Sequence, residues 1–288
     1  MNLEFSLLIA DSGSTKTDWV YLFGDSKIHF QSSGLNPFYQ SKEEVFKVLE
    51  QEVAPHISGK VDYIFFYGAG CADAASSKPI SDALSQCFTD TIEVEVASDM
   101  LGASRGLCGH EPGVVCILGT GANNAVYDGK YNIRSVGSLG FWLGDEGSGS
   151  YLGKKLVVHF LQKELPEDLS LRFADSFPEI NRLFVLDKAY KQPFPNRFFA
   201  AFTRFIGQNV THPFLNEMIA ASFALFIEKY VLKHPESKTL KVHFAGSVAY
   251  FFKEILENCL NSKGLMIGNI VKAPMEGLIH YHTVTQQK

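Results

Sequence analysis

Short apolar runs, each broken by glycine, aspartate or serine, open the chain and predict a meander of strands. The first three runs are SLLIADSG, DWVYLFGD and KIHFQSSG, at residues 6–13, 18–25 and 27–34. A helix is expected next, because Ser41 and Glu44 have the spacing of a capping box and apolar residues then recur at helical intervals to about residue 54.

Two more strands and two more helices complete the first part of the pattern. VDYIFFYGAG at 61–70 is typical of a buried strand, and TIEVEVASD at 91–99 alternates as a half-buried one. Helices are expected at about 78–88 and from about Asp99 onward.

The same order of elements recurs after residue 113. VVCILGTG, NAVYDG and YNIRSVG are again three short runs joined by turn residues. The repetition predicts two lobes of similar topology, residues 1–112 and 113–288, with a tight boundary and a last helix that can pack back on the first lobe. In the second lobe we expect helices at about 149–164, 196–209 and 213–233, a final strand KVHFAG and a following helix VAYFFKEILENCL.

Charge and hydropathy narrow the class of partner. The 288 residues carry a formal net charge of −5, and no cluster of Lys and Arg is dense enough to indicate a nucleic-acid surface. The N-terminal residues lack a basic region before their apolar segment, and no apolar run reaches the roughly 18 residues that span a bilayer. We therefore expect a cytoplasmic protein that acts on a small molecule, with neither nucleic acid nor membrane as partner.

The five cysteines favour neither disulfides nor a zinc site. Their number is odd and no C-x-x-C pair occurs, so free thiols are the expected state. His280 and His282 lack a carboxylate or thiol neighbour in the sequence, and we leave them out of any site.

IADSGSTKTDW, at residues 9–19, brings small hydroxyl residues to the end of the first strand. Gly13 allows close approach to the backbone, and the hydroxyls that follow supply donors suited to phosphate oxygens. Asp11 would repel a bare phosphate, so its place at the strand mouth makes sense if hydrated Mg²⁺ lies between them. A plain hairpin turn is the alternative.

LGTGANN, at residues 118–124, repeats this chemistry after the strand VVCI. Two glycines flank Thr120, so backbone N–H groups and one hydroxyl can converge on a second phosphate. The segment is not a dinucleotide fingerprint, since Asn124 stands where a third glycine is needed.

Carboxylates stand at two further places. Asp99 ends a strand and is either a general base toward a hydroxyl or an N-cap of the next helix. In the glycine-rich loop GSLGFWLGDEGSGS, Asp145 and Glu146 either accept hydrogen bonds from ligand hydroxyls or cap the helix that follows. HFAGSVA, at residues 243–249, ends a strand with small residues on which a flat ring can lie.

Taken in order, these five segments resemble the sugar kinase/Hsp70/actin superfamily, and within it the BadF/BadG/BcrA/BcrD ATPase family, to which N-acetylglucosamine kinases belong. The opening hairpin is similar to the first phosphate motif, LGTGANN to the second and HFAGSVA to the adenosine motif. The glycine-rich loop is similar to the segment that the kinase branch carries between them. Residues 165–240 contribute no signature.

The resemblance implies an α/β fold of two ribonuclease-H-like lobes with ATP in an interlobe cleft, and phosphorylation of N-acetylglucosamine or a related amino sugar at O6. It implies that Asp99 is the catalytic base and that Asp11 binds Mg²⁺ through water. The sugar would meet Asn36, Asp99, Gly140 and Asp145. The ATP would meet Asp11, Gly13, Ser14, Thr15, Lys16, Thr17, Gly119, Thr120, Gly121, Gly246, Ser247 and Ala249.

Two departures from the pattern concern the choice of sugar. Ser12 and Ser14 stand where many relatives carry Gly, and Ala122 stands where animal kinases carry a Ser that can contact the sugar. The phosphate-transfer motifs themselves are intact.

Two other function classes stay open. An ATPase activator of a 2-hydroxyacyl-CoA dehydratase or benzoyl-CoA reductase system needs cysteine ligands for an iron–sulfur cluster, and here only Cys108 and Cys116 flank the lobe junction, without a close cysteine pair. A non-catalytic sugar sensor is the other, although no helix-turn-helix extension precedes residue 1. NRFFAAFTRF, at residues 196–205, is either a homodimer face or an amphipathic core helix.

Overall fold

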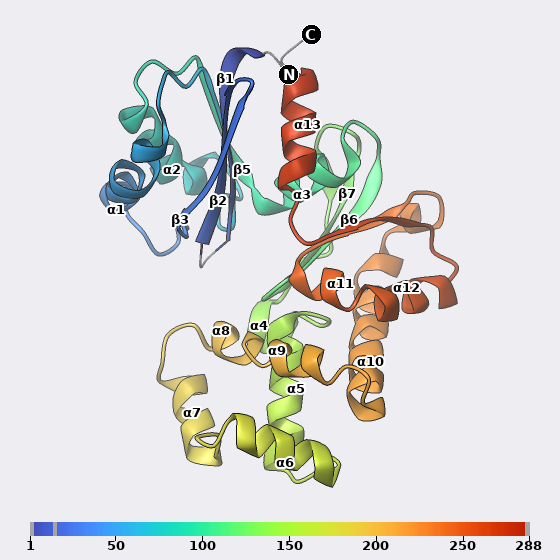
Figure 1. Ribbon diagram of the computed structural model, residues 1–288. Coiled ribbons are helices and arrows are strands. Elements are labelled where there is room, and N and C mark those ends of the chain that lie inside the picture. Colours follow the sequence, from blue (N-terminus) through green and yellow to red (C-terminus); the bar gives the residue numbers. More distant parts are fainter. Residues whose placement is uncertain (1–2, 14–15, 286–288) are drawn as a thin grey trace. The chain divides into compact units, whose positions relative to one another are not determined.

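The computed structural model describes residues 3–13 and 16–285 of the 288. It divides into two units (Figure 1). The first comprises Met1–Glu111, Gly129–Asn132 and Pro274–Lys288, and the second comprises Pro112–Asp128 and Ile133–Ala273. The assignment of residues 1–112 and 113–288 to two domains stays a prediction.

The first unit is built on a five-stranded sheet in the order β3-β2-β1-β4-β5. β1 runs antiparallel to β2, which runs antiparallel to β3, while β4 and β5 continue the sheet parallel to β1. The strands are β1 Leu3–Ser12, β2 Lys16–Gly24, β3 Ser26–Ser33, β4 Tyr63–Gly68 and β5 Glu93–Ser98.

Helices cover both faces of this sheet (Figure 1). α1 and α2 pack over a core that includes Trp19 and Phe66, and α13 packs on the opposite face through Met275 and Leu278. The C-terminal helix thus belongs to the first unit, where it also contacts α3. The helical segments are α1 Lys42–Val48, η1 Leu49–Val53, η2 Ala54–His56, α2 Ala74–Cys87, α3 Asp99–Cys108 and α13 Met275–Thr285.

The second unit repeats the topology. Its sheet has the order β8-β7-β6-β9-β10, in which β7 is antiparallel to β6, and β9 and β10 extend the sheet in parallel. This is the order of the first sheet, so the predicted α/β fold with two ribonuclease-H-like halves is confirmed. The strands are β6 Gly113–Leu118, β7 Ala122–Tyr127, β8 Asn132–Arg134, β9 Val242–Ala245 and β10 Ile267–Val271.

The second unit carries far more helix, gathered around a phenylalanine-rich core. Phe199, Phe202 and Phe205 are buried in that core, which favours the core-helix interpretation of residues 196–205, while a homodimer stays a prediction. The helices are α4 Gly140–Leu143, α5 Gly149–Leu161, α6 Glu167–Ser176, α7 Arg182–Tyr190, α8 Pro195–Ala200, α9 Thr203–Gln208, α10 Pro213–Lys229, η3 Val231–Lys233, η4 Pro235–Lys238, α11 Ser247–Phe251 and α12 Lys253–Ser262.

Several expectations need correction. Helix α2 begins at Ala74 rather than near residue 78, because Asp73 and Ser76 form a capping box there. The helix expected at 196–209 is two short helices, α8 and α9. KVHFAG is not the last strand, since β10 follows it. The capping box of Ser41 and Glu44 at the start of α1 is confirmed.

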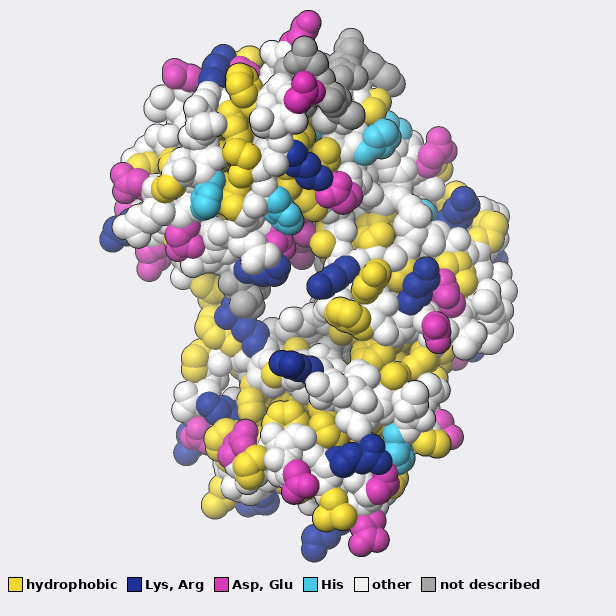
Figure 2. Space-filling model, in the orientation of Figure 1, with side chains coloured by type: hydrophobic (Ala, Val, Ile, Leu, Met, Phe, Trp, Pro, Cys, Tyr) yellow, Lys and Arg dark blue, Asp and Glu magenta, His cyan; other side chains and the backbone are white. Residues whose placement is uncertain are grey.

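The surface carries both signs of charge. Basic and acidic side chains are interspersed over the face shown in Figure 2. Among the described residues, no helix is long and apolar enough to cross a membrane.

Candidate functional site

In the first unit, three parallel strands deliver the candidate residues to one edge of the sheet. Ser12 is in register with Gly68 on β4, and Gly68 is in register with Ser98 on β5. Asp11 and Asp99 flank this level, so both carboxylates stand at the carboxyl ends of the strands, where ligands bind open α/β sheets.

The pKa values of both carboxyl groups are raised. Burial, and next the Asp99 carboxylate, raise the pKa of Asp11 to about 7. Burial likewise raises the pKa of Asp99, which the hydrogen bond from the Met100 amide at 2.8 Å only partly offsets. The N-cap of α3 is Ser98, whose hydroxyl accepts from the Leu101 amide, so Asp99 is not needed as the cap.

The hairpin after β1 is closed by a backbone bond from the amide of Gly13 to the carbonyl of Lys16, at 3.0 Å. Ser14 and Thr15 lie outside the described residues. Lys16 is exposed, and its Nζ lies 3.0 Å from Asp18. The Thr17 side chain is fully buried, and its hydroxyl lies 2.7 Å from that of Ser12 and donates to the Ser33 carbonyl. The buried Thr17 hydroxyl therefore stabilises the hairpin through these hydrogen bonds.

Asn36 lies in the same unit and is almost completely buried. Its Oδ1 accepts from the amide of Phe38 at 2.9 Å and fixes a turn. A side chain at Gly70 would place its Cβ 2.6 Å from that oxygen, so the backbone of residue 70 passes directly over Asn36.

In the second unit, the hairpin between β6 and β7 is attached to the start of α5. The carbonyls of Gly119 and Thr120 accept from the amides of Gly149 and Ser150, at 2.8 and 3.0 Å. Gly121 lies so close to Asp145 that a Cβ there would stand 3.0 Å from the carboxylate. Thr120 is exposed, which leaves its side chain accessible to a ligand.

The strand β9 brings the third motif to this hairpin. Gly246 has φ of 119°, and a Cβ on it would fall 2.3 Å from the carbonyl oxygen of Leu118. Only glycine allows this contact, so the start of α11 lies directly against the hairpin.

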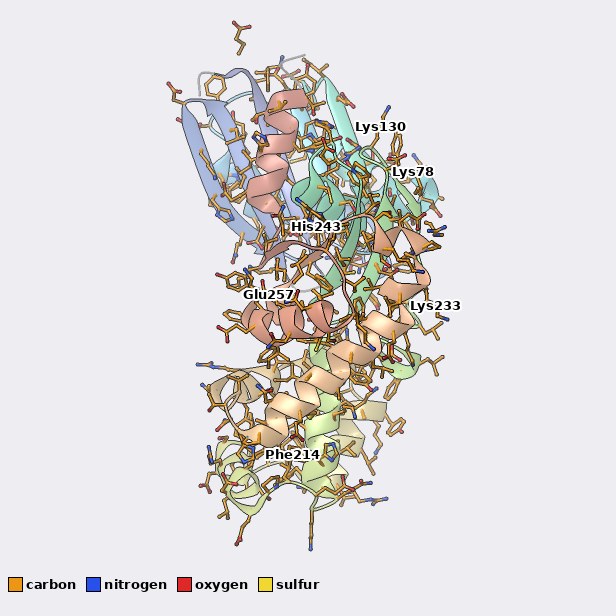
Figure 3. All side chains as sticks on the ribbon, turned by 90° about the vertical axis from the view of Figure 1, so that its right-hand side faces the viewer. Lys78, Lys130, Phe214, Lys233, His243 and Glu257 are labelled. Atoms are coloured by element: carbon orange, nitrogen blue, oxygen red, sulfur yellow. The ribbon has the colours of Figure 1, made fainter. Side chains whose placement is uncertain are left out.

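His243, labelled in Figure 3, lies on β9, and its Nδ1 accepts from the Asn269 amide at 3.1 Å. Burial lowers the pKa of His243 to about 4, so this histidine is a neutral structural residue.

Asp145 is buried beside the same hairpin. Its Oδ1 accepts from the hydroxyl of Ser138 at 3.0 Å and from the amide of Ala122 at 3.3 Å. The N-cap of α5 is Ser148, so neither Asp145 nor Glu146 caps that helix. Gly140 opens the short helix α4 in the same loop, with φ of 69°.

A cavity of about 470 Å³ opens beside the start of α11. Ser247 of the adenosine motif lines it, whereas Ala249 is fully buried and is not among the lining residues. Another part of the lining comes from α9, a segment for which the sequence indicates no site residue. The remaining lining residues are Thr203, Arg204, Gly207, Gln208, Val248, Phe251 and Phe252.

The described residues contain no group of three or more His, Cys, Asp or Glu side chains that could hold a metal ion. A single carboxylate such as Asp11 can still take part in binding Mg²⁺, because this ion usually keeps several waters and is bound by one or two carboxylates together with substrate phosphates.

No protein-family model and no curated protein matches the chain. Among solved structures, the putative N-acetylglucosamine kinase of Porphyromonas gingivalis is 38% identical, with a TM-score of 0.91 over 97% of this chain and 99% of that one. The putative N-acetylglucosamine kinase of Chromobacterium violaceum is 16% identical, with a TM-score of 0.72 over 96% of this chain and 98% of that one. A ROK family glucokinase from Streptomyces griseus, in complex with glucose and AMPPNP, is 15% identical, with a TM-score of 0.58 over 98% and 100%. The last two show a shared fold.

Proposed function

The chain belongs to the N-acetylglucosamine kinase family, and on that premise we propose that it transfers the γ-phosphoryl group of ATP to the 6-hydroxyl of N-acetylglucosamine or a closely related amino sugar. The observation that carries the proposal is the 38% identity to a putative kinase of this kind over nearly the whole of both chains. The motif residues described above supply the chemistry that such a transfer needs.

Asp99 is the proposed base. It accepts the proton of the sugar 6-hydroxyl as that oxygen attacks the γ-phosphorus, and the bond from the γ-phosphorus to the β,γ-bridging oxygen breaks to release ADP. Its place at the edge of the sheet, with one oxygen held by the Met100 amide, supports this role because a general base needs a fixed orientation.

In the first unit, the hairpin from Gly13 to Thr17 would hold phosphate oxygens through backbone amides, the hydroxyls of Ser14 and Thr15 and the ammonium group of Lys16. Thr17 would act by holding the hairpin in shape, since its hydroxyl is buried. Asp11 would hold Mg²⁺ through a water molecule, and the ion would supply positive charge that offsets the charge of the phosphates.

In the second unit, the amides and hydroxyl of Gly119, Thr120 and Gly121 would hold further phosphate oxygens. Gly246 and Ser247 would meet the nucleoside, for which the adjoining cavity of about 470 Å³ offers room. Ala249, fully buried, would support the start of α11 from within and make no direct contact with ATP.

In the first unit, the residues proposed to bind the sugar are Asn36 and Asp99. In the second unit, they are Gly140 and Asp145. The Asp145 carboxylate accepts from two donors among the described residues, and a carboxylate has about four lone-pair sites, so it can accept from sugar hydroxyls as well. Asn36 would contribute through its amide group.

The test is an assay of coupled ADP release with N-acetylglucosamine, glucosamine, N-acetylmuramic acid and glucose. We expect turnover with N-acetylglucosamine to exceed the rate without sugar by at least about 100-fold. A rate that no sugar stimulates contradicts the kinase assignment, and a preference for glucose contradicts the amino-sugar assignment.

The nucleoside cavity can be tested separately with Gly207→Trp. Gly207 lines the cavity, and a Cβ there meets only the Phe252 ring, at 4.0 Å. An indole at this position should occupy space meant for the nucleoside and raise the KM for ATP about 10-fold or more, with the KM for sugar unchanged. Steady-state kinetics with each substrate varied in turn measures both values. An unchanged KM for ATP would place the nucleoside elsewhere.

A further inference from the structure

Asp145 stands in a backbone conformation that a residue with a side chain adopts only at a cost. Its φ of 57° lies in the left-handed region, and Gly144 and Gly147 are close on either side. Aspartate adopts this conformation more readily than most residues other than glycine, but still at some cost. Groups that hold residue 145 in place therefore favour it.

Those groups are found on the next residue, Glu146. Its side chain is 5% exposed, and its carboxylate accepts a hydrogen bond from the Tyr230 hydroxyl at 2.7 Å and pairs with the Lys229 ammonium. Lys229 is the last residue of α10 and Tyr230 is the C-cap of that helix. The carboxylate is thus anchored to the end of a long helix whose own face is packed in the core.

The Tyr230 hydroxyl also limits the residue on the other side of Asp145. A Cβ added to Gly144 would lie 3.1 Å from this oxygen. The end of α10 therefore contacts the chain both before and after Asp145.

The two neighbouring carboxylates have separate partners. The Asp145 carboxylate accepts hydrogen bonds from the Ser138 hydroxyl and from the Ala122 amide at the hairpin that follows β6. The Glu146 carboxylate instead accepts from the end of α10. Burying a carboxylate without donors is costly, so the two donors of α10 stabilise Glu146 in this place. This gives the loop one preferred position.

We infer that Glu146, held by Lys229 and Tyr230, is a positioning residue for the sugar: it fixes the left-handed conformation of Asp145 and so the direction in which the Asp145 carboxylate is presented. This rests on the proposed function, in which Asp145 binds sugar hydroxyls. Glu146 itself touches neither sugar nor ATP in this arrangement.

The test compares Glu146→Gln and Tyr230→Phe with the unaltered enzyme. Both changes keep the size of the side chain, and Tyr230→Phe removes a single hydroxyl. We expect each to raise the KM for sugar about 10-fold, as loss of a charge-assisted hydrogen bond allows, while the KM for ATP stays within about twofold. Calorimetric titration with the sugar alone should show the same loss of affinity.

A matched control comes from the same helix. Glu228 precedes Lys229 on α10 and pairs with Lys263 at 2.8 Å, on the exposed surface. Lys263→Met removes that ion pair and should leave both KM values unchanged.

The outcomes separate the two hypotheses. If the unaltered enzyme phosphorylates sugar but Glu146→Gln and Tyr230→Phe lower only the melting temperature or kcat, with the KM for sugar unchanged, Glu146 is merely structural and the inference is wrong. An equal rise in the KM for ATP overturns it as well. If the unaltered enzyme turns over no sugar, the proposed function fails and this inference fails with it.

Discussion

Asp99→Asn is expected to lower kcat for sugar phosphorylation by about 10²- to 10⁴-fold, the usual contribution of a positioned general base. Asparagine keeps the shape of the side chain, and its Oδ1 can still accept from the Met100 amide, so α3 should begin at the same residue. What is lost is the ability to take a proton. Nucleotide affinity should stay within about twofold.

The measurement is single-turnover transfer from ATP to sugar, together with a titration of ATP binding. Asp82→Asn is a suitable control, because Asp82 pairs with Lys78 on an exposed face of α2. If Asp99→Asn keeps more than about a tenth of the transfer rate, the proton is accepted by another group. If ATP binding is lost as well, Asp99 acts on the nucleotide.

The pH dependence adds an independent check on the same residue. Burial raises the pKa of Asp99 above its ordinary value of 3.8, and a base must be ionised to act. Activity should therefore fall as pH decreases through this raised pKa, which places the acid limb of the kcat profile above pH 3.8. The pH profile of the residual activity of Asp99→Asn should lack the decrease that protonation of Asp99 causes.

The repeated topology could be predicted from the sequence because the signals for the strands and helices of each half lie within short stretches of the chain. Three short runs joined by turn residues occur twice, and the Ser41–Glu44 capping box marks a helix start by chemistry confined to four residues. The stretch 165–240 could not be placed beyond its helical periodicity, since a core built of phenylalanines from several short helices is decided by tertiary packing.

In the candidate site, too, some features could be predicted from the local sequence and others could not. The sequence indicates that Asp11 and Asp99 each stand at the end of a strand, but that the two strands end at one edge of the same sheet follows from the strand pairing in the structure. The competing roles of Asp99 and of Asp145 as helix caps could not be rejected from sequence, because Ser98 and Ser148 are equally good caps and only the backbone decides between neighbours. The cavity wall on α9 could not be foreseen either, since Gly207 and Thr203 carry no motif and acquire meaning only beside Ser247.

Asp11→Asn is expected to remove most of the activity and yet to raise the melting temperature of the ligand-free protein at pH 8. Burial and the neighbouring Asp99 raise the pKa of Asp11 to about 7 in the folded chain, from 3.8. A raised carboxyl pKa means that the folded state gains stability from the proton below pH 3.8, and that this gain is lost as pH rises through about 7. At pH 8 the ionised Asp11 therefore opposes folding, and asparagine avoids that cost.

The expected gain in free energy of unfolding at pH 8 follows from the raised pKa of Asp11. A rise of about three pH units, at about 1.4 kcal/mol each, sets an upper limit of about 4 kcal/mol for this gain. Because the Asp11 side chain is partly exposed, we expect about 2 kcal/mol. We expect a gain of a few degrees at pH 8 that disappears near pH 4, where the folded unaltered protein already carries the proton.

Scanning calorimetry of both proteins at pH 4, 6 and 8 without nucleotide measures this dependence, and the transfer assay measures the loss of activity. Asp82→Asn again serves as the control, because this carboxylate is exposed and paired with Lys78. A melting temperature that Asp11→Asn lowers at pH 8 would mean that Asp11 is held by favourable contacts in the free protein. A gain in stability together with lost activity would mean that the ionised Asp11 at the end of β1 destabilises the fold but is required for phosphate transfer. Residues that act in a reaction often lower the stability of the fold in this way.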